Sequence, residues 1–507
     1  MKRTMDASSR LKAYLMGIDT HQEPVVYMRE DCQVCRSEGF AAHSRVGVSS
    51  DGQAIIATLN IVYGETIPNG HVGLSNVAME RLGVSQEDPL SVHHAPYVES
   101  LSLVRQKVFG HALGGDDMDR IVVDISDHKY SDVEIACFLS VCAGGRLNID
   151  EITSLTRAMV NCGERLSWDN VDRVFDKHCV GGLPGNRTTP LVVSIVSAAG
   201  LVMPKTSSRA ITSPAGTADT MEALTTVDLD LAAIQRVVRE TGACLAWGGA
   251  INLSPADDLL IRIERSLDLD GEGQLVASVL SKKIAAGSTH VVIDIPIGDT
   301  AKVRSRAEAD QLSSLFSDVG AACGLHVRCV VTEGSKPVGK GIGPVEEARD
   351  VMAILQGEPH APGDLKARAI LLAAHVFDMA DGCGLAAGKL KAEIILNSGE
   401  AWAQFRRIVQ AQGGLKNLGG ARFTHRELAS EAGRILSVDN RRLARLAKLA
   451  GAPASPAAGL RLLVNVGDIV TVGQPLYELL SDTVGERDYA LAYGASELPI
   501  FVIQTES

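Results

Sequence analysis

Two loops rich in small residues, each followed by the predicted start of a helix, constrain this chain more than any other feature. The first is Gly-Gly-Leu-Pro-Gly at residues 181–185, which leads into an apolar run at 191–199. The second, at 207–217, is rich in serine and threonine. Glycine lets backbone N–H groups approach an anion, and helix N-termini add the positive end of a dipole. The spacing therefore predicts an α/β unit in which two helix starts face one anion, with phosphate as the first candidate.

The side chains at these loops suit a phosphate dianion. Lys177 and His178 directly precede the first glycines, and Thr188 and Thr189 stand at the start of the following helix. Cations neutralise the dianion, whereas hydroxyls donate hydrogen bonds without charge. Helix capping would explain the two threonines equally well, and a Lys-His pair alone is ordinarily a surface feature. The second loop adds six candidates: Ser207, Ser208, Arg209, Thr212, Ser213 and Thr217.

A further group of candidate residues surrounds a predicted helix at 273–286. Ser278 and Lys282 are four residues apart, so they project from one face of that helix. Asp270 lies in the preceding turn, and Lys302 follows a later turn. A polar stripe with a single lysine is more often a solvated face than a binding site. In combination with the loops, however, these side chains suit a polar heterocycle.

The bulk composition is that of an enzyme-like chain with several domains. At 507 residues the chain exceeds one ordinary core, so two to four domains are expected. The net charge of −12 argues against nucleic acid and acidic membrane surfaces as partners, because both require a basic excess. The N-terminus lacks the apolar segment of a signal peptide, and no stretch approaches the roughly 18 apolar residues of a membrane span. We therefore expect a cytoplasmic protein.

The cysteines favour reduced thiols over a disulfide framework. Ten of them are scattered along the chain, and Cys32 and Cys35 form the only C-x-x-C pair. A structural zinc needs four ligands, and no second pair stands at a suitable spacing. We expect no metal.

Hydrophobic patterns predict an α/β multidomain fold: a helical lobe and an α/β lobe with an interlobe cleft, a small N-terminal β-rich domain and a C-terminal α+β domain. Strands at 290–295 and 327–331 flank a helix at 307–322, and a capping box at Ser131 and Glu134 begins a helix. The expected segments are the β-rich domain at 1–95, the helical lobe at 96–168 and 229–288, the α/β lobe at 169–228 and 289–430, and the C-terminal domain at 431–507.

Together these motifs resemble the thymidine and pyrimidine-nucleoside phosphorylase family. The family pattern K-H-S-x-G-G is matched at 177–182, and a serine-arginine loop ending in G-T is matched at 207–217. L-P-G-N at 183–186 and the sequence at 207–219 are similar to the second-type branch, which contains archaeal AMP phosphorylase and bacterial thymidine phosphorylases. The extra N-terminal domain points to the same branch. The resemblance spans nearly the whole chain.

The resemblance implies reversible phosphorolysis, in which thymidine and phosphate give thymine and 2-deoxyribose 1-phosphate. Phosphate is a co-substrate, no cofactor is implied, and the family suggests a homodimer packed through the helical lobe. For phosphate, the resemblance implies Lys177, Gly182, Thr189, Ser207 and Thr217. For the nucleoside or nucleotide, it implies Ser208, Arg209, Thr212, Ser213, Ser278, Lys282 and Lys302. The catalytic residues it implies are Asp270, as proton donor, His178 and Lys177.

Alternative functions stay open on the sequence. An AMP phosphorylase, which would release a base and ribose 1,5-bisphosphate, is a nearly equal rival because adenine leaves better when an acid such as Asp270 protonates it. A phosphoribosyltransferase and an inactive ligand-binding relative are less favoured. Cys179 stands where the family pattern has serine, and a thiol is a weaker hydrogen-bond donor. Either phosphate affinity is lower, or Thr188 and Thr189 compensate.

Overall fold

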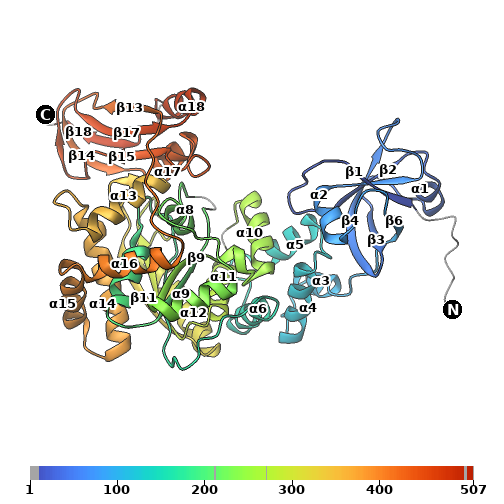
Figure 1. The fold of residues 1–507 in the computed structure, drawn as a ribbon, viewed down its shortest axis with the longest axis horizontal. Helices are drawn as coiled ribbons and strands as arrows, with labels where there is room; N and C mark the ends of the chain where they lie inside the picture. The colour runs from blue at the N-terminus through green and yellow to red at the C-terminus, as the bar shows by residue number, and fades with distance from the viewer. Residues whose placement is uncertain (1–10, 211–212, 270, 496–498, 506–507) are drawn as a thin grey trace. The chain divides into compact units, whose positions relative to one another are not determined.

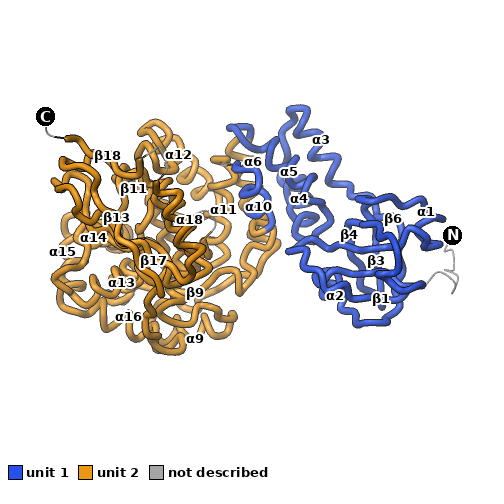
Figure 2. The backbone as a smooth tube through the Cα atoms, turned by 90° about the horizontal axis from the view of Figure 1, so that it is seen from above, with its two compact units in different colours: residues 1–146, 259–269 blue, residues 147–258, 270–507 orange. Residues whose placement is uncertain are grey.

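The structure is a computed structural model that describes residues 11–210, 213–269, 271–495 and 499–505. Thr212 and Asp270, both predicted site residues, lie outside the described residues. Two compact units are present (Figure 2). The first comprises the described residues up to 146 together with 259–269, and the second comprises the described part of 147–258 and 270–507.

The first unit begins with a closed six-stranded barrel of order β1-β5-β2-β4-β3-β6 (Figure 1). Alternating apolar residues point inward, so that Val26, Val46, Leu59 and Leu74 are fully buried. The barrel contains two short helices, α1 and α2, besides its strands. The bounds are β1 (Leu11–Leu15), β2 (Val25–Arg29), α1 (Gln33–Glu38), β3 (Arg45–Ser50), β4 (Gln53–Val62), β5 (His71–Leu74), α2 (Asn76–Leu82) and β6 (Pro89–His94).

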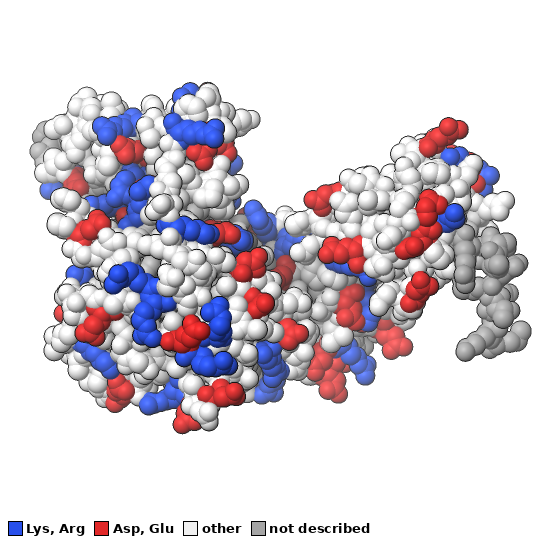
Figure 3. Space-filling view, viewed as in Figure 1, with Lys and Arg blue, Asp and Glu red and all other residues white. Residues whose placement is uncertain are grey.

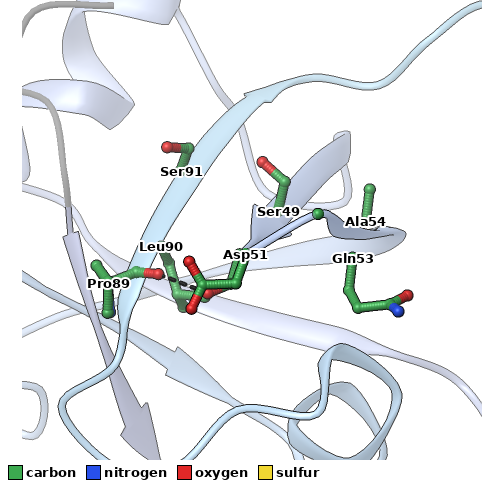
Figure 4. Close-up of a pocket in the computed structure, with 9 residues that line it drawn as sticks. Ser49, Asp51, Gln53, Ala54, Pro89, Leu90 and Ser91 are labelled. Atoms are coloured by element: carbon green, nitrogen blue, oxygen red, sulfur yellow. Dashed lines mark hydrogen bonds between the residues drawn. The ribbon is translucent and has the colours of Figure 1, made fainter.

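A cavity of about 290 Å³ lies on this barrel, at the β3–β4 hairpin and β6 (Figure 4). Ser50 Oγ donates to the carbonyl of Pro89 at 2.8 Å and joins the two sides. None of the predicted site residues lines this cavity.

Three helices follow the barrel in the first unit, together with residues 259–269. The predicted capping box is present, because Ser131 N donates to the Glu134 carboxylate at 2.7 Å and Ser131 Oγ accepts from the Glu134 amide. The bounds are α3 (Leu101–Val108), α4 (Gly115–Ser126), α5 (Asp132–Cys142) and α10 (Pro255–Leu267), of which the last spans both units.

The second unit is built around parallel strands. β7 (Phe175–Cys179), β10 (His290–Ile297) and β11 (His326–Glu333) form a sheet of order β11-β10-β7. β8 (Met203–Ser207) and β9 (Ala243–Trp247) form a second parallel pair, and a bridge between Val174 and Val202 connects it to β7. The carboxyl ends of β7 and β8 are therefore followed directly by the two glycine and hydroxyl loops. β10 and β11 contain the predicted strands.

Helices surround these strands and bury the largest apolar core of the unit (Figure 1). α7 is the most apolar of them, and Leu191, Val192, Ile195 and Val196 are fully buried. The bounds are α6 (Ile149–Asn161), α7 (Thr188–Ala198), α8 (Thr217–Glu222), α9 (Leu231–Thr241), α11 (Glu272–Ala285), α12 (Arg306–Ala322), α13 (Pro344–Leu355), α14 (Gly363–Asp381), α15 (Leu385–Asn397) and α16 (Glu400–Ala411).

The C-terminal part contains a four-stranded sheet of order β12-β15-β17-β13 and a three-stranded sheet of order β16-β14-β18. α17 and α18 pack beside them around Leu443, Leu446 and Leu479. The bounds are β12 (Gly341–Ile342), β13 (Phe423–Leu428), β14 (Gly433–Val438), α17 (Asn440–Leu449), β15 (Gly459–Leu462), β16 (Ile469–Val470), β17 (Pro475–Ser481), α18 (Val484–Gly494) and β18 (Phe501–Gln504).

The α/β multidomain fold class predicted from the sequence is confirmed. The structure divides the predicted helical lobe differently, because α6 belongs to the second unit while α3, α4 and α5 belong to the first. The segment 229–288, predicted to be helical, also contains the strand β9, on which α9 packs. The prediction missed this strand because it is a short apolar run before two glycines, and such a run has the same pattern as a buried helix segment.

Within the described residues, no single helix is both long and apolar enough to cross a membrane. α14 and α15 meet that test only when taken together, across a bend of 118°. On the face shown in Figure 3, acidic and basic side chains are intermixed over both units.

Candidate functional site

Lys177 is a buried residue near the end of β7, the strand that precedes the first loop. It lies on β7, opposite Val292 of β10, and only 1% of it is exposed. Its Nζ donates to Thr188 Oγ1, the first residue of α7, at 2.7 Å. Burial lowers the pKa of Lys177 from its usual value. A buried ammonium beside a helix N-terminus gains from a neighbouring anion, since an unpaired buried charge is costly.

Gly182 permits a close approach between the first loop and Lys302. Its φ of +82° lies in the left-handed region, and a Cβ there would stand 2.5 Å from the Lys302 backbone nitrogen. Glycine is therefore required on two grounds, backbone conformation and space. Gly182, predicted to bind phosphate, and Lys302, predicted to bind the nucleoside or nucleotide, are thereby neighbours although they are far apart in sequence.

Ser207, the last residue of β8 and the first of the second loop, has a buried hydroxyl. Its Oγ makes no hydrogen bond to any residue that the structure describes. Leaving a buried polar atom unsatisfied costs about 1–3 kcal/mol, so such groups are uncommon without a role. A ligand oxygen at this position would satisfy it.

Arg187 joins the two loops. It is the N-cap residue of α7, and its guanidinium donates to Thr217 Oγ1 at 2.7 Å, to the Ala215 carbonyl at 2.8 Å and to the Glu347 carboxylate at 2.7 Å. Because the guanidinium is a rigid planar fork, these bonds fix the position of the second loop against the first. Thr217 is thus held at a defined distance from α7.

A cluster of buried charges surrounds Asp176, the residue before Lys177. The fully buried Asp176 pairs with Lys205 at 3.2 Å and with Lys283 at 2.9 Å. Burial alone would raise the pKa of Asp176, but the two lysines outweigh it and hold that pKa below its usual value. Burial lowers the pKa of Lys205 to about 7, although Asp176 opposes this. Burial and the surrounding lysines also lower the pKa of His178 well below its usual value, so its imidazole is neutral at pH 7.

Ser278 and Lys282 converge on one buried carboxylate. Asp257, in the first turn of α10, accepts from Lys282 Nζ at 2.6 Å and from Ser278 Oγ at 3.0 Å. Only 2% of the Asp257 side chain is exposed. The predicted shared face of the helix is therefore present, and its two polar groups are fixed by a third.

Arg209 is fixed by acidic and aromatic partners on the second loop. Its guanidinium donates to both Glu222 carboxylate oxygens, one of them at 2.9 Å, and lies 4.7 Å from the centre of the Trp247 ring. The neighbouring Ser208 accepts the Ala218 amide through its carbonyl at 3.3 Å. The Arg209 charge is therefore largely balanced within the loop.

Cys179 is a neutral thiol. Burial, and secondarily the nearby Asp294 carboxylate, raise its pKa to about 12. The Asn186 amide lies 3.4 Å from the Cys179 sulfur and 3.3 Å from Asp294, so one side chain connects the end of β7 with β10. Thr189, ten residues after Cys179, is buried in the first turn of α7. The thiol is held in place, but it cannot supply negative charge to the site.

Two family models match this part of the chain. The model described as the helical bundle domain of a glycosyl transferase family matches residues 101–163. The model described as the a/b domain of a glycosyl transferase family matches residues 171–402. The second range includes every described residue of the site.

Curated relatives match over almost the entire length. "Putative thymidine phosphorylase 2" of Acidovorax sp. (strain JS42) is 54% identical over 502 residues, which cover 99% of this chain and 98% of the relative. "Putative thymidine phosphorylase" of Polaromonas sp. (strain JS666 / ATCC BAA-500) is 53% identical over 488 residues, 96% of this chain and 95% of the relative. The chain belongs to the thymidine and pyrimidine-nucleoside phosphorylase family. The resemblance inferred from the motifs is confirmed.

Solved structures share the fold at low identity. The anthranilate phosphoribosyltransferase of Thermus thermophilus matches with a TM-score of 0.51 and 20% identity over 61% of this chain and 98% of that one. The enzyme from Saccharomyces cerevisiae gives a TM-score of 0.51 at 14% identity, over 63% of this chain and 99% of that one. These likenesses concern the fold alone.

Membership of the phosphorylase family establishes a pentosyltransferase that acts on small molecules together with phosphate. Within the described residues, the structure joins the two predicted loops and pairs Ser278 with Lys282 through Asp257. Sequence reasoning missed Arg187, Asp257 and Glu347. Asp257 and Glu347 offered little signal, because acids in a first helical turn are explained by the helix dipole. Arg187 did offer one, because a cation at a helix N-terminus is unfavourable without another partner.

Proposed function

We propose that this chain catalyses the reversible phosphorolysis of thymidine. A phosphate oxygen forms a bond to the anomeric carbon, the N-glycosidic bond breaks, and its electron pair leaves with thymine, giving 2-deoxyribose 1-phosphate. The observation that supports this most is the pair of cation–hydroxyl contacts at the two loops, Lys177 with Thr188 and Arg187 with Thr217. Together with the unpaired Ser207 hydroxyl, they supply charge and donors for a phosphate dianion.

The proposed phosphate position suits the charge changes of the reaction. The transition state is an oxocarbenium-like sugar between an incoming dianion and a departing base. Lys177 and the N-terminus of α7 hold the dianion, and no metal or organic cofactor is needed because phosphate is the co-substrate. Electrostatic stabilisation of this kind is most effective when donors are fixed in advance.

The proposed base side is formed by His178, Ser278 and Lys282. Thymine leaves as an anion, and the Lys282 ammonium, held by Asp257, stabilises that charge. His178 is neutral at pH 7, so it offers one N–H donor and no charge. A neutral donor suits the carbonyl oxygens of a pyrimidine.

The second candidate is phosphorolysis of a nucleoside 5′-monophosphate such as AMP. The contact between Gly182 and Lys302 favours it, because it places another lysine next to the first loop. A substrate with its own phosphate would use such a cation.

An assay of base release decides between the two candidates. The protein is incubated with phosphate and, separately, with thymidine, uridine, cytidine, adenosine, AMP and CMP, and free base is measured. Release from thymidine supports the first candidate, and release only from monophosphates rejects it in favour of the second. Lys177→Met is the matched negative variant, since it keeps the buried chain length but removes the charge. If it retains full activity, Lys177 does not belong to the phosphate site.

A further inference from the structure

The contact between Arg187 and Thr217 determines how the threonine hydroxyl can be used. Arg187 Nη1 donates to Thr217 Oγ1 at 2.7 Å, across 30 residues of sequence. A hydroxyl has one proton and two lone pairs, and the guanidinium has only donors. The Thr217 proton must therefore turn away from Arg187. Among the residues that the structure describes, none accepts this proton.

Arg187 is itself fixed on its other sides. Its Nε donates to Glu347 at 2.7 Å and its Nη2 donates to the Ala215 carbonyl at 2.8 Å. The Glu347 side chain is 1% exposed, and it also accepts from Thr220 Oγ1 at 3.2 Å. Thr220 lies on the same short helix as Thr217. The guanidinium thus cannot rotate without breaking charge-assisted bonds in a buried setting.

The same arrangement occurs at the first loop. Lys177 Nζ donates to Thr188 Oγ1 at 2.7 Å, so this hydroxyl also has its proton directed elsewhere. At both loops a cation occupies a lone pair of a threonine at the first position of a helix. A hydroxyl polarised in this way is a better donor to an anion, because neighbouring hydrogen bonds strengthen one another.

We propose that Arg187 is a positioning residue that turns the Thr217 hydroxyl proton toward bound phosphate. This inference rests on the proposed function, which places phosphate between the two loops. Each of its three nitrogens donates one hydrogen bond within the protein, and one of these is to Thr217. Its effect on phosphate passes through Thr217.

A double-mutant cycle with kinetics in phosphate tests the proposal. Thr217→Val removes the hydroxyl at similar volume, and Arg187→Met removes its orienting donor. Each is expected to raise KM for phosphate about 10-fold or more, the usual effect of losing a hydrogen bond to a charged group. KM for the nucleoside should change less than about 2-fold, and the double variant should resemble the worse single variant. Thr217→Ser, which keeps the hydroxyl, should restore most of the affinity.

Arg349→Met is the matched control. Arg349 lies on α13 and pairs with Glu346 at 2.9 Å, so this variant breaks another arginine–glutamate pair without touching either loop. It should leave KM for phosphate unchanged. If Arg187→Met does not fold, the cycle is repeated in a Glu347→Gln background, because the amide removes the buried charge that the loss of Arg187 leaves unpaired.

The outcomes separate the inference from the function on which it rests. If the wild type releases no base from any nucleoside or nucleotide, and phosphate does not raise its Tm, the proposed function fails. If the wild type is active but the two substitutions multiply, so that the double variant shows roughly the product of the single effects, Arg187 does not act through Thr217. If Arg187→Met changes Tm or kcat but leaves KM for phosphate unchanged, Arg187 likewise does not act through Thr217. Its role is then structural.

Discussion

The Asp257 carboxylate lies 2.6 Å from the Lys282 ammonium, and the same oxygen accepts from Ser278. Asp257 is buried, so the pair is only weakly screened by solvent. The arrangement holds the lysine in one rotamer and balances its charge until another anion arrives. It also connects the start of α10 with the middle of α11.

Asp257→Asn should impair catalysis more than stability. The amide keeps the shape but removes the charge, so Lys282 is no longer held and Ser278 loses a charged acceptor. We expect kcat/KM for the nucleoside to fall about 10- to 100-fold, as for other losses of a charged hydrogen bond. Steady-state kinetics measure this. Asp310→Asn, which breaks an exposed ion pair with Arg306 on α12, is the control, and equal activity of the two variants would show that the Asp257 contact is unimportant.

Ser207→Ala should weaken phosphate binding without destabilising the protein. The Ser207 Oγ is buried and has no partner among the described residues, so its removal costs no hydrogen bond of the free protein. We expect a several-fold rise in KM for phosphate and an unchanged or slightly higher Tm. Ser194→Ala is the contrast: its Oγ donates to the Pro190 carbonyl at 2.7 Å inside α7, so it should lower Tm and leave KM alone. A lower Tm for Ser207→Ala with unaltered KM would assign Ser207 to the fold.

Gly182→Ala should be far more damaging than Gly181→Ala. Both glycines have positive φ, +82° and +94°, so alanine costs on the order of 1 kcal/mol of strain at either position. Only at Gly182 would the new Cβ meet the backbone of Lys302, whereas nothing lies within 4 Å of it at Gly181. Thermal unfolding and KM for phosphate measure the difference. Equal effects of the two variants would mean that the loop does not approach Lys302 in solution.

Acid should destabilise the protein through His178. The folded protein lowers the pKa of this group well below the ordinary value of about 6.5, so below that pH the unfolded chain binds a proton that the folded chain does not. The contribution of His178 to the free energy of unfolding therefore falls as the pH drops below about 6.5, by up to about 1.4 kcal/mol per pH unit, and is constant above it.

The measurement is the difference in Tm between pH 5.5 and 7.5. His178→Gln should make this difference smaller than in the wild type, because glutamine does not titrate. His21→Gln, at an exposed turn between β1 and β2, is the control substitution. An unaltered difference in His178→Gln would show that the folded protein protonates this imidazole as readily as the unfolded chain.

Local patterns were sufficient for the elements and for the family. The strands at 290–295 and 327–331 are found within β10 and β11, because continuous apolar runs between turns have few other outcomes in a parallel sheet. Ser131 and Glu134 form the predicted capping box, whose geometry depends on residues three apart. The two loops at 181–185 and 207–217 could be predicted for the same reason, because each is defined by its own short sequence.

The sequence by itself determined which residue types stand at the two loops, and thereby the family and the kind of ligand. Only the tertiary structure decided which side chains meet: Arg187 with Thr217, Asp257 with Lys282, and Gly182 with the backbone of Lys302. These partners are separated by 30, 25 and 120 residues. No local pattern encodes such contacts, because they depend on how the parallel strands and their helices pack. The preference of a residue type is local, whereas the position of a charge within a site is set by the whole fold.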